Sequence, residues 1–308
     1  MNKKVKAIIL SSVALASALG IATGVFFGVY PITPKVEIKS ADERISNNES
    51  LLVASYNTAA PWGNLIEGTY TTRRARLFAQ QINNTLPDVL GVQELNSFWA
   101  EKMEDLLPQY AYYGVKRGGD DKERTSEINA IYYLKNKFEL LESDTFWISL
   151  TPETESRFEG AGCHRICSYV VLKNKETGFV FAHMNTHLDN SSTDAQNLGG
   201  KLIAEKAEEL KSKYDNLSVV ITGDFNQYPD GLAVQTLMDK GFASACDTAE
   251  NGKAIGTYQG WGKDLYDAPI DFIFADDTLK IKNYKVHEEK QDNSYVSDHF
   301  MITAEVEI

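Results

Sequence analysis

The feature that most constrains this chain is a series of short apolar runs, from residue 51 onward, that alternate with amphipathic stretches of helical period. The apolar runs have the length and the Val, Ile, Tyr and Phe content typical of strands. The predicted strands are 51–56, 89–92, 128–133, 168–172, 179–184, 218–222, 271–274 and 301–306, and the predicted helices are 72–85, 98–107, 194–214 and 232–240. Short strands mixed with a few helices predict an α+β fold in which sheets pack together and helices cover the outside.

Polar side chains stand where several of these runs begin or end. They are Asn57, Glu94, His187, Asp224 with Asn226, Asp271, and Asp298 with His299. A single Asp-Phe-Asn after a strand is more often a turn, because Asp and Asn favour turns. Six such positions, all carrying oxygen or imidazole groups, instead match the way a sheet presents functional side chains at one rim. The sequence therefore predicts one site built from strand ends.

The amino-terminal region is a separate predicted unit. Lys3, Lys4 and Lys6 precede an uncharged stretch of 24 residues, 7–30. A helix of that length reaches about 36 Å, enough to cross a bilayer core of roughly 30 Å. Within residues 1–30 we expect a transmembrane helix, with a cleaved signal peptide as the alternative. The leading lysines predict a folded domain outside the cytoplasm, either held at the cell membrane or secreted.

Residues 31–50 mix Pro, Lys, Glu, Asp and Asn without apolar periodicity, which predicts a linker. Neither a repeat of fixed period nor a second linker follows in the sequence. We therefore expect residues 51–308 to form one domain, and we expect that domain to be a monomer.

The predicted domain is acidic. Removing the 6 basic and 4 acidic residues of 1–50 from the totals of 31 and 43 leaves residues 51–308 with a net charge of −14. Proteins gain most of their non-specific affinity for nucleic acid from basic side chains, so this charge disfavours nucleic acid as a partner without excluding it. The densest basic cluster, Arg73, Arg74 and Arg76, lies on a predicted helix, where it either flanks the site or forms a solvated face.

Residues 51–308 carry a series of short motifs: Tyr56-Asn57, Gln93-Glu94, Glu127 ahead of Asn129, Arg165, Thr186-His187-Leu188-Asp189, Gly223-Asp224-Phe225-Asn226, Asp271 and Ser297-Asp298-His299. Their order along the chain resembles the endonuclease/exonuclease/phosphatase superfamily, which includes deoxyribonuclease I, abasic-site endonucleases, inositol polyphosphate phosphatases and neutral sphingomyelinases. The resemblance implies a four-layer α/β sandwich with two packed mixed sheets, in agreement with the predicted strands and helices.

The resemblance also implies a metal site. Glu94 resembles the family's main metal carboxylate, with Asn57 close by and Asp298 as a further ligand or as a carboxylate that positions His299. Hard oxygen ligands together with water suit Mg²⁺, for which Mn²⁺ or Ca²⁺ could substitute. The alternative for Glu94 is a surface carboxylate, although the apolar strand before it makes exposure less natural.

The remaining positions resemble the family's catalytic groups. Asp224 is expected to orient or deprotonate the attacking water, and Asn226 to donate a hydrogen bond to the phosphoryl oxygen. His299 with Asp271 resembles the family's His–Asp pair, in which the carboxylate sets the tautomer of the imidazole. His187 with Glu127 resembles a second such pair, which some members use on the leaving-group side.

Two further assignments concern the same rim. Arg165 and Asn185 are expected there as substrate contacts, with a structural role for Arg165 as the alternative. His183 shares a strand face with His187 and is expected to be a core histidine, because the His-Glu-x-x-His pattern of zinc peptidases is absent from the sequence.

The sequence thus predicts a Mg²⁺-dependent phosphoester hydrolase that acts outside the cytoplasm on small-molecule or lipid-borne phosphoesters by in-line attack of water. An extracellular nuclease of deoxyribonuclease type is the first alternative, and a catalytically inactive binding domain tethered to a membrane is the second. The second is weaker, because each expected catalytic position carries the expected residue type. The loops that would decide the substrate match no pattern that identifies it.

Overall fold

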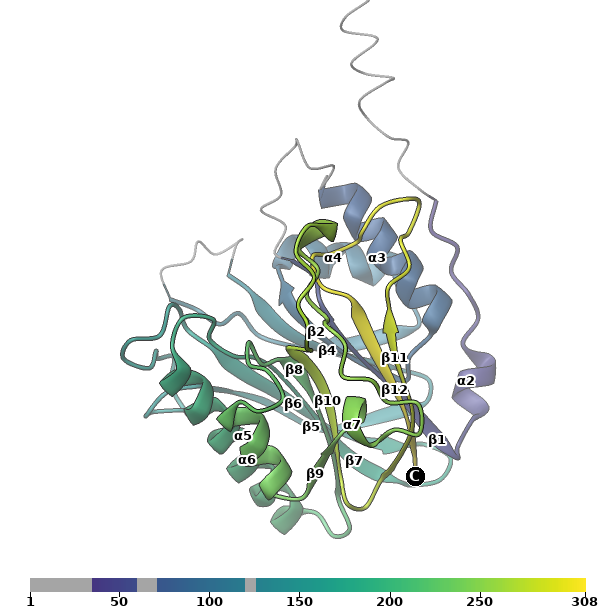
Figure 1. Ribbon diagram of the computed structural model, residues 1–308. Coiled ribbons are helices and arrows are strands. Elements are labelled where there is room, and N and C mark those ends of the chain that lie inside the picture. The colour runs from purple at the N-terminus through teal and green to yellow at the C-terminus, as the bar shows by residue number, and fades with distance from the viewer. Residues whose placement is uncertain (1–34, 60–70, 120–125) are drawn as a thin grey trace, which may run out of the picture. The chain divides into compact units, whose positions relative to one another are not determined.

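Two six-stranded mixed sheets form the framework of the protein (Figure 1). The computed structural model describes residues 35–59, 71–119 and 126–308, and both sheets lie within the unit Val36–Ile308. The first sheet contains, in spatial order, β11 (Lys280–His287), β12 (Met301–Glu307), β1 (Ser50–Asn57), β2 (Val89–Leu95), β4 (Ile128–Leu134) and β3 (Tyr110–Tyr113). The second contains β5 (Phe138–Trp147), β6 (Ile166–Asn174), β7 (Val180–His187), β8 (Ser218–Asp224), β10 (Asp271–Asp276) and β9 (Phe242–Ser244).

Each sheet has one parallel pair of strands near its centre, β1 with β2 in the first and β7 with β8 in the second. A helix connects the strands of each pair, α3 (Thr71–Thr85) in the first and α5 (Thr193–Lys213) in the second. The connecting helix carries the chain back to the edge where the first strand began, so both strands run in the same direction. Their carboxyl ends therefore lie at one edge of the sheet. Asn57 and Glu94 thereby reach the edge of the first sheet, and His187 and Asp224 reach that of the second.

Helices cover the outside of the paired sheets. Helices α3 and α4 (Ser97–Leu106) lie together on one side, and α5 and α6 (Leu232–Asp239) lie together on the other (Figure 1). Phe78 of α3 packs against Tyr56 of β1 and Trp99 of α4, with ring centroids 5.2 and 5.8 Å apart. Gly200 of α5 approaches α6 so closely that a Cβ would overlap Ala233. This arrangement confirms the predicted α+β fold of two packed mixed sheets with helices outside.

A buried polar bridge joins the two sheets. Asn185 of β7 donates from Nδ2 to the carbonyl oxygens of Val92 and Ala130 in the other sheet, at 3.0 and 2.9 Å. Its Oδ1 accepts from Gln93 and Thr222 at 2.7 and 3.1 Å. The side chain of Asn185 is fully buried, and both hydrogens and the oxygen of its amide are already paired with residues of the two sheets. The prediction that Asn185 contacts the substrate is therefore wrong.

Within the described residues, the strands that were not predicted from sequence are the edge strands. Strands β11 and β3 are the outer strands of the first sheet, and β5 and β9 are those of the second. An edge strand has a solvated side and carries polar residues, so it lacks the apolar run that marks a central strand. In β5, for example, residues 139–144 are exposed or half-buried, and four of those six are Glu, Ser or Asp.

Part of the predicted linker 31–50 is folded onto the domain. Asp42–Ser46 forms the short helix α2, and Ala41 before it is 5% exposed within the hydrophobic core. Lys137 donates from its buried Nζ to the carbonyl oxygen of Arg44 at 3.0 Å. The linker prediction missed this packing because a main-chain carbonyl that accepts a hydrogen bond leaves no trace in the side-chain pattern.

The transmembrane or signal helix predicted within residues 1–30 lies outside the described residues. Among the residues that the structure does describe, no helix combines the length and the apolar character needed to cross a membrane.

His183 is buried inside the second sheet. Its Nε2 pairs with the hydroxyl of Thr222 at 2.8 Å, and its side chain is fully shielded from solvent. Burial lowers the pKa of His183 to about 3. The side chain is therefore a neutral core histidine at physiological pH, as predicted from the sequence.

We expect His183 to make the protein lose stability as the pH falls from about 6.5 toward 3. In this window the unfolded chain binds a proton at His183 and the folded chain does not, so unfolding is favoured by about 1.4 kcal/mol per pH unit. Urea unfolding at pH 7.0 and 5.0 measures the effect. Wild type should lose about 2 kcal/mol more than the His183→Gln variant, which keeps a donor for Thr222 but does not titrate. Equal losses in both proteins would contradict the assignment.

Candidate active site

Three adjacent strands of the second sheet place acidic and imidazole side chains in one row. Asp224, the last residue of β8, faces His187 at the end of β7 on one side and Asp271 at the start of β10 on the other. Because β10 runs antiparallel to β8, the first residue of one lies beside the last residue of the other. The predicted strand-end residues of this sheet thus meet at a single edge.

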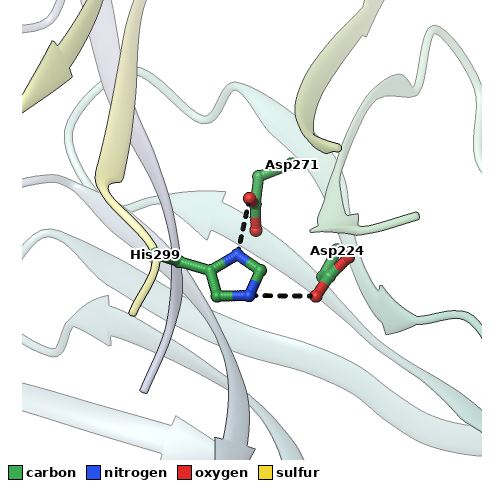
Figure 2. Close-up of side chains that lie close together, drawn as sticks. All are labelled: Asp224, Asp271 and His299. Atoms are coloured by element: carbon green, nitrogen blue, oxygen red, sulfur yellow. Dashed lines mark hydrogen bonds and ion pairs between the residues drawn. The ribbon is translucent and has the colours of Figure 1, made fainter. Parts of the chain in front are cut away.

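Asp224, Asp271 and His299 form a connected cluster at this edge (Figure 2). Nδ1 of His299 lies 2.8 Å from Oδ2 of Asp271, and its Nε2 lies 3.7 Å from Oδ2 of Asp224. Burial alone would lower the pKa of His299, but the carboxylates around it, Asp271 first, outweigh burial and raise that pKa to about 10. The imidazole is therefore a cation at neutral pH, held between two buried carboxyl groups.

Asp224 has the surroundings of a general base. Burial, and then the nearby Asp271 carboxylate, raise the pKa of Asp224 to about 7. Its Oδ2 accepts from Nδ2 of Asn57 at 2.9 Å, and its Oδ1 accepts from the backbone N–H of Asn226 at 2.9 Å. A carboxyl group with a pKa near neutrality can take a proton from water and release it again in the same cycle.

Two hydroxyl groups hold the cluster in place. Thr257 donates to Oδ2 of Asp271 at 2.6 Å. Ser297 donates to the carbonyl oxygen of Asn57 at 2.6 Å and accepts from the backbone N–H of His299 at 3.2 Å. Ser297 therefore couples the strand end of the first sheet to the histidine, and Thr257 orients the carboxylate that pairs with it.

The first sheet contributes a second group of carboxylates. Glu94 has a φ of 57° and lies at a β-bulge, where the register between β2 and β4 shifts between Val92 and Leu95. A non-glycine residue in the left-handed region is strained, and bulges redirect side chains at functional sites. Here Glu94 lines the same cavity as Asp298.

Glu94 and Asp298 fit a divalent cation. Burial raises the pKa of Asp298, and the neighbouring Glu94 carboxylate adds to this against the opposing charge of His299. Two carboxylates that repel each other in a cavity are stabilised by a cation, and their hard oxygen atoms suit Mg²⁺. The 2.8 Å separation of His299 and Asp271 is, by contrast, a hydrogen bond with no space for an ion.

Asn57, expected as a metal ligand, makes three hydrogen bonds in the structure. Its Nδ2 donates to Oε1 of Glu94 at 3.1 Å and to Oδ2 of Asp224 at 2.9 Å, and its Oδ1 accepts from the N–H of Ala59 at 2.9 Å. The amide oxygen is thus used in the turn after β1, while the amide nitrogen bridges carboxylates from both sheets. Asn57 is therefore a donor that links Glu94 to Asp224, and its role as a metal ligand stays a prediction.

His187 and Glu127 lie near each other without a hydrogen bond between them. Nδ1 of His187 is 3.8 Å from Oε2 of Glu127, which accepts from Arg117 at 2.7 Å. Burial, and then the positive charges of Arg165, Arg117 and His299, hold the pKa of His187 well below its usual range. The imidazole is therefore neutral and can donate one hydrogen bond. The predicted His187–Glu127 pair is thus a 3.8 Å contact in which the imidazole is neutral and Glu127 also pairs with Arg117. Its role on the leaving-group side stays a prediction.

Arg165 lies in the wall of the cavity and is 5% exposed. Its Nε lies 3.4 Å from Oδ2 of Asp189, and its Nη2 lies 3.4 Å from Oδ1 of Asn190. Its buried Nη1 has no hydrogen-bond partner in the part of the chain that the structure describes. A buried guanidinium N–H is costly to leave unpaired, and phosphate is an acceptor that matches its geometry.

Asn226 follows Asp224 with a φ of 50° and lines the same cavity. One hydrogen of its side-chain amide is donated to the carbonyl oxygen of Leu188 at 3.0 Å. Because the amide nitrogen carries two hydrogens, the second can be donated to an acceptor in the cavity.

Two of the three arginines in the basic cluster on α3, Arg73 and Arg74, are buried, and Arg76 is half-buried. Arg74, 1% exposed, donates to the carbonyl oxygens of Thr58 and Ala59 at 2.8 Å each, and to that of Val296 at 3.3 Å. Arg73 is also buried, at 7% exposed. Arg74 thus ties the loop after β1 to the loop that leads to His299, so the expectation of a solvated face is wrong for both buried arginines.

The site residues line a cavity of about 800 Å³. Predicted residues in its wall are Glu94, Glu127, Arg165, His187, Asp224, Asn226, Asp298 and His299. Residues in the wall that the sequence analysis did not name are Arg117, Gly162, Cys163, Asn190, Ser191, Tyr228, Tyr258, Tyr266 and Ile270. Tyr228, Tyr258 and Tyr266 lie outside strands, so no apolar period marks them. For the loop that carries Tyr258 and Tyr266, the sequence signal is the run of aromatic and glycine residues at 256–262.

The comparisons with known proteins agree with this geometry. The profile of the Endonuclease/Exonuclease/phosphatase family matches residues 54–299. A protein of that family from Bacteroides thetaiotaomicron is 30% identical with a TM-score of 0.77, and the match covers 83% of this chain and 94% of that chain. A mannosyl-6-phosphatase from the same species is also 30% identical with a TM-score of 0.77, over 84% of this chain and 100% of that chain. The human Nocturnin catalytic domain with bound sulfate shares the fold at 18% identity and a TM-score of 0.65, and the match covers 83% of this chain and 94% of that chain. No curated protein matches the sequence significantly.

Proposed function

The chain belongs to the endonuclease/exonuclease/phosphatase family of phosphoester hydrolases, and from this premise we propose that it hydrolyses small-molecule or lipid-borne phosphoesters with the help of Mg²⁺. The observation that carries the proposal is one cavity lined by the Glu94 and Asp298 carboxylates, the His299 cation and the Arg165 guanidinium. The mannosyl-6-phosphatase at 30% identity supports a small phosphate ester as substrate.

The proposed reaction is in-line attack of water on phosphorus. Glu94 and Asp298 would hold Mg²⁺, which would supply positive charge for the phosphoryl oxygens. Asp224 orients the water and accepts its proton as the oxygen–phosphorus bond forms, which its pKa of about 7 allows. The bond from phosphorus to the ester oxygen breaks at the same time, and the leaving oxygen departs on the opposite side and takes a proton from solvent to become the alcohol, while Asp224 returns its proton to solvent.

Four donors surround the position of the phosphoryl group in this proposal. Asn226 donates its second amide hydrogen, and Arg165 donates from its buried Nη1, so both favour negative charge as it develops. His299 contributes a positive charge whose orientation is set by Asp271. Neutral His187 donates one hydrogen bond, and its help to the leaving group remains a prediction.

We expect a small phosphate ester to be cleaved with a higher kcat/KM than plasmid DNA at about 0.15 M salt with Mg²⁺. The net charge of −14 over residues 51–308 repels a polyanion beyond the local site, whereas one phosphate group needs only the groups inside the cavity. Parallel assays on glycerol phosphate, phosphatidic acid vesicles and plasmid measure this preference. The His299→Ala variant, purified alongside, reports contaminating activity. Efficient plasmid nicking with inert small esters would favour the nuclease alternative.

Action outside the cytoplasm is a proposal that depends on residues 1–30. Their uncharged stretch and leading lysines support it, and the described residues do not include them.

A further inference from the structure

The loop 257–266 is fastened to the catalytic cluster along its length. The backbone N–H of Gln259 donates to the carbonyl oxygen of Asp298 at 2.8 Å, and Tyr258 forms a β-bridge with His299. The loop closes on itself where the N–H of Tyr266 donates to the carbonyl oxygen of Tyr258 at 3.0 Å. At Gly256, a Cβ would overlap the carbonyl oxygen of Tyr266, so this close approach requires glycine. The position of Tyr258 and Tyr266 relative to His299 is therefore set before any ligand binds.

Three tyrosine rings extend in a row from the catalytic histidine. Tyr258 packs edge-on against His299 with ring centroids 5.1 Å apart. Tyr266 follows at 4.7 Å from Tyr258, and Tyr228 follows at 6.1 Å from Tyr266. All three line the cavity, and Tyr228 is 46% exposed although it is a large aromatic residue. The row forms an aromatic wall that leads outward from the position where hydrolysis would occur.

The cavity wall outside the catalytic groups also carries polar side chains. Arg117, Asn190 and Ser191 line it together with Gly162, Cys163 and Ile270, and they offer guanidinium, amide and hydroxyl groups. The hydroxyl of Ser191 lies 3.2 Å from Oδ1 of Asn190, which also lies 3.4 Å from Nη2 of Arg165. A ligand in this cavity therefore meets aromatic rings and hydrogen-bonding groups together.

This combination matches a hexose. A pyranose ring has faces of C–H groups, which pack on aromatic rings, and a rim of hydroxyl groups, which need hydrogen-bond partners. An acyl chain would leave the polar groups of the wall unpaired, at a cost in binding free energy. A polynucleotide is disfavoured by the acidic charge of the domain.

We propose that Tyr228, Tyr258 and Tyr266 form the subsite for the organic group of the substrate, and that this group is a hexose carrying a phosphate monoester. The inference rests on the proposed function and adds to it the substrate class and the residues that select it. Tyr266, the central ring of the row, is the residue on which selection depends most.

Two primary phosphate monoesters with similar leaving groups test the proposal: mannose 6-phosphate, which has a ring, and glycerol 3-phosphate, which has none. We expect wild type to prefer the hexose phosphate in kcat/KM by at least about tenfold, as one or two good ring contacts would give. Tyr266→Ala should remove most of this preference by raising KM for the hexose ester, with a much smaller change in kcat/KM for the glycerol ester. Tyr266→Phe keeps the ring and should keep the preference.

Leu265→Ala is the matched control, since Leu265 precedes Tyr266, is 59% exposed and does not contribute to the cavity wall. Its preference should equal that of wild type. A wild type that cleaves both esters equally well, or a Tyr266→Ala variant that loses activity on both alike, would overturn the subsite and leave the proposed function standing. A stronger preference for adenosine 5′-phosphate or phosphatidic acid vesicles would overturn the hexose class. Wild-type protein inactive on every ester would overturn the proposed function itself.

Discussion

Replacing His299 by alanine is expected to lower kcat/KM by about a thousandfold, within the range for removal of an acid–base or charged group at a reaction centre. The variant loses a buried cation that lies between Asp271 and Asp224, at 2.8 and 3.7 Å. Two carboxyl groups then face each other without compensation, which disfavours ionisation of Asp224. Steady-state kinetics on a small phosphate ester, with thermal unfolding to verify folding, measures the loss.

The double variant shows whether Asp271 acts through the histidine. Asp271 contacts Nδ1 of His299, so Asp271→Asn combined with His299→Ala should cost little more than His299→Ala alone. His287→Ala is the matched control. His287 lies on the outer strand β11, where its ring pairs with the hydroxyl of Thr303, and it does not line the cavity. Multiplicative losses in the double variant would show that Asp271 acts independently of His299. A His299→Ala enzyme with full activity would remove the histidine from the proposed mechanism.

Replacing Glu94 by glutamine is expected to lower Mg²⁺-dependent turnover by at least about a hundredfold, since a bound cation supplies several kcal/mol of charge stabilisation. Glutamine keeps the size of the side chain and an oxygen that can accept from Asn57, so the effect isolates the lost negative charge. Calorimetric titration with Mg²⁺ in the absence of substrate should show binding to wild type and much weaker binding to the variant. This second readout does not depend on catalysis.

Glu139→Gln serves as the control for the charge change, because Glu139 lies on the solvated side of β5. It should match wild type in Mg²⁺ binding and in turnover. Unchanged turnover in Glu94→Gln, or full wild-type activity in excess chelator, would contradict the metal site.

The central strands could be predicted from sequence because burial on both faces requires apolar residues along the whole strand. β8 is an example, since Ser218–Asp224 is buried throughout and was predicted to within two residues. The edge strands could not be predicted, because each is a strand only through its hydrogen bonds to the one strand beside it. In β11 the buried residues Ile281 and Tyr284 lie three positions apart across a register shift, so no period of two marks the strand, which is identifiable only beside β12.

The candidate site could be anticipated where its residues end a strand. Glu94, His187 and Asp224 follow apolar runs, and the carboxyl ends of two parallel pairs bring them to one cavity. The motif also identified Asp271 and His299, although their hydrogen bond joins residues 28 apart in sequence. A polar residue that directly follows an apolar run is visible in the sequence, because the residue and the run are neighbours along the chain.

By itself, the sequence determined the two-sheet framework, the acidic charge and the residue types available for phosphoester chemistry. The tertiary structure alone decided which polar groups face the cavity and which are used elsewhere. Asn185 bridges the sheets, Arg74 binds carbonyl oxygens of the loops beside the site, and Tyr266 joins the aromatic wall. The physical reason is that a polar or aromatic side chain acts through the partner it meets, and these partners come from segments distant in sequence.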